Sequence, residues 1–180
     1  AREARFAFFR KTMRQIGASV LLLGHQKDDI AEQMLMRIAR GSGLSGLCGP
    51  RAVHALEGGF YHVRPLLSLR SGWLRQALQE VGVSWAEDST NTQNIYLRNR
   101  LRNQVVPLWQ TACLPACAIE GAARCRFLLE EAQEALVSWA RTFLPAGSGQ
   151  NPQPLPLEPL RGKPPGLLRQ VLYLWLLECH

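Results

Sequence analysis

Apolar residues at the start of the chain recur at helical spacing. Phe6, Phe9 and Met13 are three and four residues apart, with Arg and Lys between them. This spacing places the three side chains on one face of a helix over residues 1–16. Gly17 follows directly and provides a natural C-terminal stop for that helix.

The next apolar positions are continuous instead of periodic. Residues 19–23 read SVLLL and are bounded by glycines, which predicts a short buried strand of a parallel sheet. Helical spacing then returns, and we predict a second helix from Asp29 to about Ala39, with Asp29 as its cap and Glu32 at the reciprocal position of a capping box. Helix, strand and helix in this order are typical of an α/β fold. Because such a domain should begin with a strand, we expect its front half to be absent from this chain.

Shorter elements are predicted up to about residue 110. They are a strand at residues 60–65, a helix at 68–81, a strand at 83–85, a polar loop at 88–94 and a basic helix at 95–109. The rest is mainly helical, with helices at 119–143 and 167–177 on either side of a Pro/Gly-rich loop at 144–166. We therefore predict two parts, residues 1–110 and the truncated start of a second, helical domain at residues 111–180.

Composition narrows the choice of partner and compartment. Hydrophobic residues make up 47% of the chain and its net charge is +7, which indicates a folded core and favours a polyanionic partner. Most of the basic residues are arginine, which suits phosphate, although a GC-rich genome produces the same bias. The five cysteines form no CxxC pair, so a zinc ribbon is disfavoured. Their odd number and the lack of a signal peptide indicate a cytoplasmic protein, and no apolar run is long enough to span a membrane.

Three acids lie at the start of the second predicted helix. Asp28 and Glu32 are four residues apart and share one face, while Asp29 lies about 100° round the helix. Carboxylates this close repel each other unless a positive charge lies among them, which phosphate-bound Mg²⁺ or a substrate ammonium would supply. A capping box with acids favoured by the helix N-terminus explains the same pattern without any function.

Two further groups flank this helix. His25 ends the preceding apolar segment and is a candidate to contact a phosphate or a reacting group, or is an ordinary polar residue. The turn made by Arg40, Gly41, Ser42 and Gly43 is expected to offer free backbone N–H groups and a guanidinium to an anion. It lacks the GxxxxGK[ST] pattern of a Walker A loop.

The predicted basic helix at residues 95–109 has two faces. Its apolar positions, which we expect to point inward, are Leu97, Leu101, Val105 and Leu108. Arg98 and Arg102 share another face, which can grip phosphates. A solvated arginine face, paired with Glu87 and Asp88 for structural reasons, accounts for the pattern equally well.

Three ordered segments resemble one known family. HQKDDIAEQMLMRIARGSGLSGL (residues 25–47) is similar to the HxxDDxAExxLxRxxRGSGxxGL signature of bacterial tRNA(Ile)-lysidine synthetases. RPLLSLRSGWLRQALQEVGVSWAEDSTN (64–91) and YLRNRLRNQVVPLW (96–109) resemble that family's RPLL, W-x-ED-x-(S/T)N and RNxxRxxxxPxL segments. The resemblance covers about residues 1–110. It implies an α/β fold, part of a Rossmann-like, adenine-nucleotide α-hydrolase-like parallel sheet of the PP-loop ATP pyrophosphatases, followed by a helical region.

The resemblance implies a carbon–nitrogen ligase. ATP and Mg²⁺ would support the joining of free L-lysine to the wobble cytidine of the isoleucine tRNA with a CAU anticodon, through an adenylated cytidine. The partners expected are this tRNA, free lysine and, as a homodimer, a second copy of the chain.

Site residues carry over by motif position. The reaction centre would be lined by His25, Asp28, Asp29 and Glu32, with Asp28 and Asp29 as Mg²⁺ ligands. The nucleotide and cytidine pocket would be shaped by Arg40, Gly41, Ser42 and Gly43. ATP phosphates or the tRNA would be faced by Arg98, Asn99 and Arg102. Reversal of Arg98 to Glu is expected to weaken this binding without unfolding the domain.

One departure from the family is large. The phosphate-binding SGGxDS loop of the family does not occur in these 180 residues, so we expect that this polypeptide alone is inactive. Smaller departures are Gln26 and Gln33, where family members often carry His and Thr. The alternatives are a non-catalytic tRNA-binding remnant and another tRNA-modifying ATP pyrophosphatase, such as a thiolation enzyme, which usually relies on cysteine pairs that this chain lacks.

Overall fold

The computed structural model describes residues 2–87, 94–145 and 153–179. The chain divides into two compact units, Ala1–Arg126 and Phe127–His180, which are described one after the other. Most of the polar loop predicted at residues 88–94 therefore lies outside the described residues.

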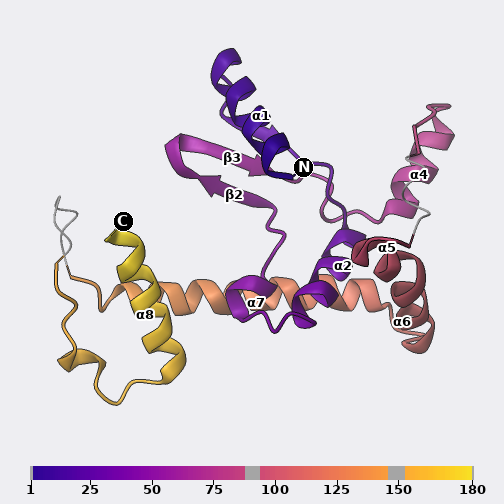
Figure 1. Ribbon diagram of the computed structural model, residues 1–180. Coiled ribbons are helices and arrows are strands. Elements are labelled where there is room, and N and C mark those ends of the chain that lie inside the picture. Colours follow the sequence, from indigo (N-terminus) through magenta and orange to yellow (C-terminus); the bar gives the residue numbers. More distant parts are fainter. Residues whose placement is uncertain (1, 88–93, 146–152, 180) are drawn as a thin grey trace. The chain divides into compact units, whose positions relative to one another are not determined.

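The first unit is organised around a three-stranded sheet in the order β1-β3-β2 (Figure 1). β1 (Val20–Leu22) pairs in parallel with β3 (Phe60–Val63), and β2 (Val53–Leu56) pairs antiparallel with the other side of β3. The strands predicted at residues 19–23 and 60–65 are thus confirmed, and so is the α/β fold class. β1 lies at the edge of this sheet with Val20 and Leu22 exposed. The expectation of a buried strand is therefore wrong for this chain.

β2 was not predicted, whereas a strand predicted at residues 83–85 is absent. β2 joins β3 through a tight turn at Glu57–Gly59, in which Gly58 and Gly59 both have φ of 76°, a conformation that favours glycine. Two glycines between short strand-like runs are a hairpin signal that identifies β2 in retrospect. Residues 83–85 are irregular, and both Val83 and Trp85 are exposed, so they have no packing surface to stabilise a strand.

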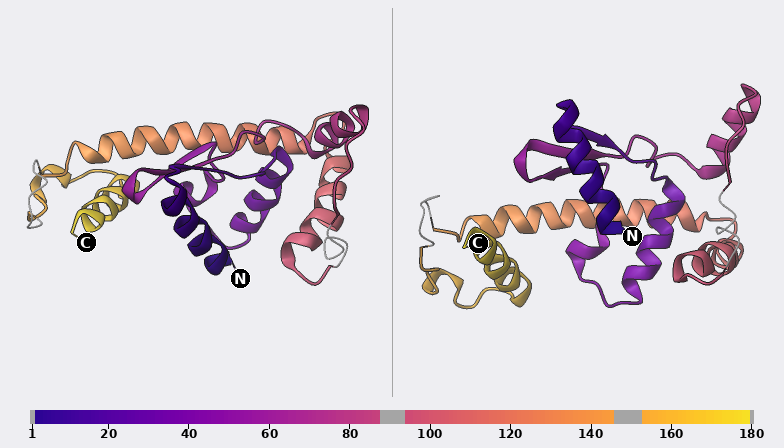
Figure 2. Two further views of the ribbon diagram at one scale, coloured as in Figure 1. Left: turned by 90° about the horizontal axis from the view of Figure 1, so that it is seen from above. Right: turned by 45° about the horizontal axis from the view of Figure 1, so that its top comes forward.

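The first unit also contains helices before the predicted basic helix. They are α1 (Arg2–Ile16), α2 (Lys27–Ile38), α3 (Leu44–Leu47) and α4 (Ser71–Glu80). α1 lies against the hairpin in both views of Figure 2, with the Phe6 ring 5.3 Å from the His62 ring and Met13 buried. The helices predicted at the start of the chain, after the first strand and at residues 68–81 are confirmed.

The predicted basic helix is present but interrupted. α5 (Leu97–Arg100) continues into a π-helical turn (Leu101–Val105) and then α6 (Val106–Ala112). A π turn is wider than an α turn, so the 3.6-residue periodicity is lost across it. The expectation that the apolar positions point inward is accordingly wrong at Leu97, Val105 and Leu108, which are all exposed.

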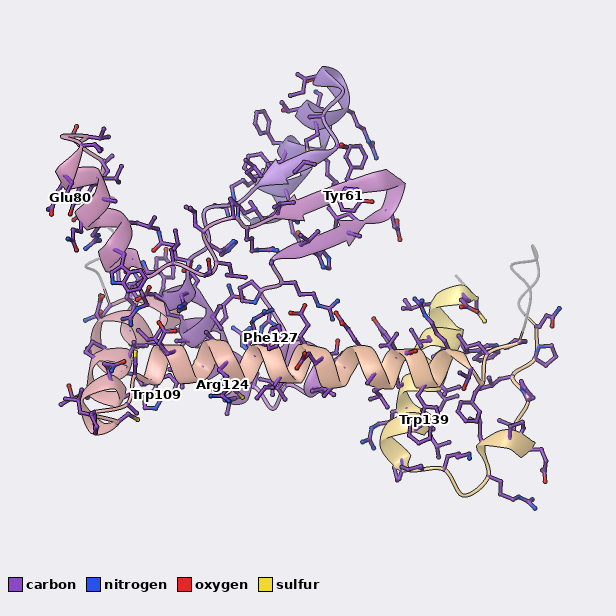
Figure 3. The ribbon with its side chains drawn as sticks, turned by 180° about the vertical axis from the view of Figure 1, so that it is seen from behind. Tyr61, Glu80, Trp109, Arg124, Phe127 and Trp139 are labelled. Atoms are coloured by element: carbon purple, nitrogen blue, oxygen red, sulfur yellow. The ribbon has the colours of Figure 1, made fainter. Side chains whose placement is uncertain are left out.

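The second unit contains the rest of one long helix and a shorter partner. α7 (Ala118–Arg141) begins in the first unit and continues into the second, where α8 (Pro165–Glu178) follows a short 3-10 turn at Glu158–Leu160. Their core consists of Ala140, Leu160, Leu167 and Val171. Gln133 on α7 also donates a hydrogen bond to Gln170 on α8 at 3.1 Å. Figure 3 marks α7 at Arg124, Phe127 and Trp139.

Both helices predicted after residue 110 are confirmed, while the boundary at 110 stays a prediction. The boundary between the two compact units falls after Arg126, inside α7, and not in a linker. None of the described helices is long and apolar enough to cross a membrane.

The core of the second unit yields a stability prediction. Leu167→Ala should lower the free energy of unfolding by about 2–5 kcal/mol, because the Leu167 side chain is almost completely buried. The matched control is Leu172→Ala on the same helix, where the side chain is 45% exposed and the loss should be smaller. Urea unfolding followed by circular dichroism measures both, and equal losses would show that α8 does not pack as described.

Candidate functional site

The first turn of α2 begins earlier than predicted, because the cap lies at Gln26 and not at Asp29. Gln26 is the N-cap residue with an extended backbone, and its N–H donates to the Asp29 carboxylate at 2.7 Å. Asp29 is therefore the third residue of the helix, where its carboxylate closes a capping box. The prediction of Asp29 as the cap and Glu32 as its reciprocal partner is wrong, because Gln26 takes the cap position and leaves Glu32 available for other contacts.

Glu32 instead pairs with two arginines, Arg98 on α5 and Arg102 in the π-helical turn that follows it. Arg98 Nε donates to Glu32 Oε2 at 2.8 Å, and Arg102 Nε donates to Glu32 Oε1 at 2.6 Å. Both guanidinium groups also reach Asp29 Oδ1, Arg102 at 3.4 Å. Asp29, Glu32, Arg98 and Arg102 form what we call the arginine–acid cluster. It brings together the two motif segments that lie 66 to 73 residues apart in sequence.

Charge and burial make this cluster tightly coupled. Glu32 is only 2% exposed, whereas the arginine side chains are 39% and 41% exposed. The hydrogen bond from Arg102 to Glu32 raises the pKa of the guanidinium above its ordinary value, although burial acts the other way. The positive charge that the neighbouring carboxylates require is therefore supplied from within the chain.

The adjacent acid, Asp28, has different partners. Asp28 Oδ2 accepts the backbone N–H of Ser71 at 2.8 Å, and Arg70 Nε lies 3.6 Å from Oδ1. Ser71 is the first residue of α4, so Asp28 caps that helix from outside and benefits from its N-terminal dipole. Arg70 and Ser71 were not predicted as site residues, and no local pattern around them indicates a contact with a residue 43 positions away.

Arg70 also connects the site to the start of α7. Its Nη1 lies 3.2 Å from the Cys117 sulfur. Nearby, Lys27 donates to both carboxylate oxygens of Glu120 at 3.0 and 2.8 Å. The backbone N–H of Glu120 lowers the pKa of the Cys117 thiol, with smaller contributions from Ile119 and Arg70, while burial opposes them.

His25 lies at the carboxyl ends of the parallel strands β1 and β3, where open α/β sheets place their ligand sites. It follows β1, and Arg64 follows the neighbouring parallel strand β3, so both lie beyond the carboxyl ends of the strands. Arg64 Nε donates to His25 Nδ1 at 3.2 Å, and Arg64 Nη1 donates to the Arg51 carbonyl at 2.7 Å. Since Nδ1 accepts a hydrogen bond, the proton of the neutral imidazole resides on Nε2.

The glycine-rich turn ends α2 and does not offer the free N–H groups that we expected. The N–H groups of Arg40 and Ser42 both donate to the Arg37 carbonyl, at 3.2 and 2.9 Å, and that of Gly41 donates to the Ile38 carbonyl at 2.9 Å. This is a Schellman arrangement, and Gly41 has the left-handed φ of 68° that it requires. The exposed guanidinium of Arg40 is the part of the turn that suits an anion.

The remaining predicted residues lie near these groups or have other roles. Asn99 is half-buried on α5 beside Arg98. Gly43 precedes the short helix α3. Glu87, considered as a partner of the basic helix, instead pairs with Arg75 at 3.2 Å, and Asp88 lies outside the described residues.

The carboxylates as arranged do not fit a shell of direct Mg²⁺ ligands. Both oxygens of Asp28 face Arg70 or Ser71, and those of Asp29 face Gln26 or the arginines. Among the described residues, no group of three or more His, Cys, Asp or Glu side chains is arranged to hold a metal ion. Direct coordination by Asp28 and Asp29 would require these hydrogen bonds to be exchanged for metal bonds.

Comparison with known proteins places the chain in a family. The family model described as the PP-loop domain matches residues 1–109. The chain therefore belongs to the PP-loop domain family, which implies an ATP-binding domain.

Curated relatives are named tRNA(Ile)-lysidine synthase. That of Enterococcus faecalis is 43% identical over 108 residues, 60% of this chain and 23% of the relative. That of Rhodopirellula baltica is 35% identical over 145 residues, 81% and 36% of the two chains. That of Streptomyces coelicolor is 35% identical over 172 residues, which are 96% of this chain and 48% of the relative. The resemblance seen in the sequence is thus confirmed, and the chain spans less than half the length of these relatives.

The arginine–acid cluster yields a second stability prediction. Replacing Arg98 and Arg102 together by Gln should cost about 3–5 kcal/mol, because the buried Glu32 carboxylate is left without a partner. The control, Arg75→Gln, breaks an ion pair whose side chains are 62% and 65% exposed and should cost less than about 1 kcal/mol. Chemical unfolding measures both values. Similar small losses would mean that the cluster does not stabilise the fold.

The same geometry opposes one earlier expectation. Arg98→Glu would place a third carboxylate against Asp29 and Glu32. We therefore expect this reversal to destabilise the first unit, so a binding loss in that variant would not by itself identify a ligand contact.

Thiol reactivity tests the contacts at the start of α7. Cys117 should be alkylated by iodoacetamide at pH 7 several times faster than the exposed Cys125, because its thiol pKa is lowered. Arg70→Gln should slow Cys117 alone. Mass spectrometry of timed reactions gives both rates in one sample, and an unchanged Cys117 rate in the variant would contradict the contribution of Arg70.

Proposed function

We propose that this chain is part of a lysidine synthase that modifies the isoleucine tRNA with a CAU anticodon. The observation that carries the proposal is the arginine–acid cluster. It joins the HxxDDxAE and RNxxR segments, although they are far apart in sequence. The curated relatives reported above carry the name tRNA(Ile)-lysidine synthase.

In the proposed reaction the cytidine is activated before lysine attacks. The 2-carbonyl oxygen of the wobble cytidine attacks the α-phosphorus of ATP and expels pyrophosphate. The lysine amine then attacks carbon 2 and expels AMP. This order gives the carbonyl oxygen, a poor leaving group, a phosphate on which to depart.

The described residues suggest a role for each part of the site. His25, whose Nδ1 accepts a hydrogen bond from Arg64, would contact a phosphate or the activated oxygen through its other ring nitrogen. Asp29 and Glu32 orient Arg98 and Arg102, whose outer atoms remain partly exposed and suit ATP phosphates or RNA. Asp28 is the acid best suited to pair with a lysine ammonium. Its ion pair with Arg70 is long, at 3.6 Å from Oδ1, and 23% of its side chain is exposed.

The rest of the proposal concerns residues and partners around this centre. Arg40, Gly41, Ser42 and Gly43 would border the nucleotide and cytidine, and Asn99 would assist Arg98. Free L-lysine is the second substrate, Mg²⁺ enters on the ATP phosphates, and the enzyme acts as a cytoplasmic homodimer.

Radiolabelled-lysine incorporation is the decisive assay. Unmodified CAU isoleucine tRNA, ATP and Mg²⁺ are incubated with the 180-residue chain or with the whole product of its gene. We expect the whole product to incorporate lysine and the 180 residues alone to be inactive, because they contain no SGGxDS loop. The matched control is the same tRNA with uridine at the wobble position, which should accept no lysine.

One observation favours a second candidate, a non-catalytic tRNA-binding protein. The acids of the cluster already have protein cations as partners, as they would in a purely structural arrangement. If the whole gene product binds the tRNA but incorporates no lysine, this second function replaces the first.

A further inference from the structure

The outer surface of α1 is rich in positive charge. Arg10, Lys11 and Arg14 are all exposed, and their spacing of one, three and four residues places them on one side of the helix. Met13, which is buried, and Phe6, which contacts the sheet, lie on a different side. The helix therefore packs through its apolar face and presents a basic one.

These cations are not neutralised by the chain itself. In the part of the chain that the structure describes, none of the three forms an ion pair with a carboxylate, and only Arg14 has a partner, the Phe60 ring at 5.8 Å. Like charges four residues apart on a helix are destabilising. Their repulsion is relieved when a polyanion binds across them.

The hairpin beside α1 lies close to these cations. His54 and His62 face each other across β2 and β3, with ring centroids 6.4 Å apart. Burial lowers the pKa of His62, and the nearby charges of Arg64, His54 and Arg10 lower it further. Because cations disfavour the charged form of His62, the electrostatic potential at its ring is positive, although a ring whose pKa is lowered adds little positive charge of its own.

Arg64 links this surface to the candidate site. It donates a hydrogen bond to His25, and its charge acts on His62 two residues earlier. A strand of nucleic acid that enters the site beside His25 would thus find further cations on α1. Arginine is well suited to phosphate, and each phosphate contact adds to a salt-dependent affinity.

We propose that Arg10, Lys11 and Arg14 form a binding surface for the phosphate backbone of the substrate tRNA. This surface, the α1 basic face, rests on the proposed function because it takes the tRNA as its occupant. Its contacts go to phosphates and not to bases, so they contribute affinity and orientation but no sequence preference.

The test compares two triple variants of equal charge. The first changes Arg10, Lys11 and Arg14 to Gln. The control changes Arg124, Arg141 and Arg169 to Gln, which also removes three exposed positive charges but from α7 and α8. Thermal unfolding followed by circular dichroism verifies that both variants are folded.

Affinity for unmodified CAU isoleucine tRNA is measured by fluorescence anisotropy between 50 and 200 mM salt, values within the range where phosphate contacts dominate. We expect the first variant to bind about tenfold more weakly at low salt, with a slope of log K against log salt smaller by about 2–3. The control should change by less than about twofold. Equal losses in the two variants, or no loss in either, would overturn the α1 basic face.

Two further experiments distinguish this inference from the proposed function and from binding to an anionic membrane. Lysine incorporation by the whole gene product tests the proposed reaction. If that product is inactive but its tRNA binding still depends on the α1 basic face, the reaction is refuted and the binding surface is supported. Flotation with phosphatidylserine-containing vesicles tests an anionic membrane. Vesicle binding that is lost in the first variant, with tRNA binding unchanged, would refute the RNA assignment.

Discussion

The burial of the Glu32 carboxylate between Arg98 and Arg102 is the interaction on which the site depends. A carboxylate that is 2% exposed is destabilising unless hydrogen-bonded cations compensate it, and here two guanidinium groups do so. Because α5 and its π-helical turn have exposed apolar positions, their place beside α2 depends on charge more than on hydrophobic contact. The same pairing fixes the orientation of both arginines.

The first turn of α2 distributes its charged residues among three other elements. Asp28 caps α4, Asp29 turns to the arginines of α5, and Lys27 pairs with Glu120 on α7. Neighbours in sequence therefore have separate structural tasks. A ligand that competes for one of them acts on the contacts of all three elements, since their anchor points lie within one helical turn.

Much of the fold follows from apolar spacing, whereas the partners of the charged residues do not. The 3.6-residue period identified α1 and α7, because burial of one helix face imposes this spacing. The continuous apolar run identified β1, although Val20 and Leu22 are exposed in the structure. β2 is short, exposed and polar at His54, so only its glycine turn signals it. The pattern of acids near α2 suited a ligand and a protein cation equally well. Only the folded chain shows that the cations of Asp29 and Glu32 come from residues 66 positions or more away.

α7 belongs to both compact units, and one ladder of backbone hydrogen bonds therefore crosses the boundary at Arg126. A cut at that boundary would leave four carbonyl groups and four N–H groups without helical partners. Helix formation is cooperative, so fraying that begins in the α7–α8 core can spread along the same helix toward Glu120 and the site. The two units are separate as packing cores but joined as a folding system, in which the integrity of one contributes to the order of the other.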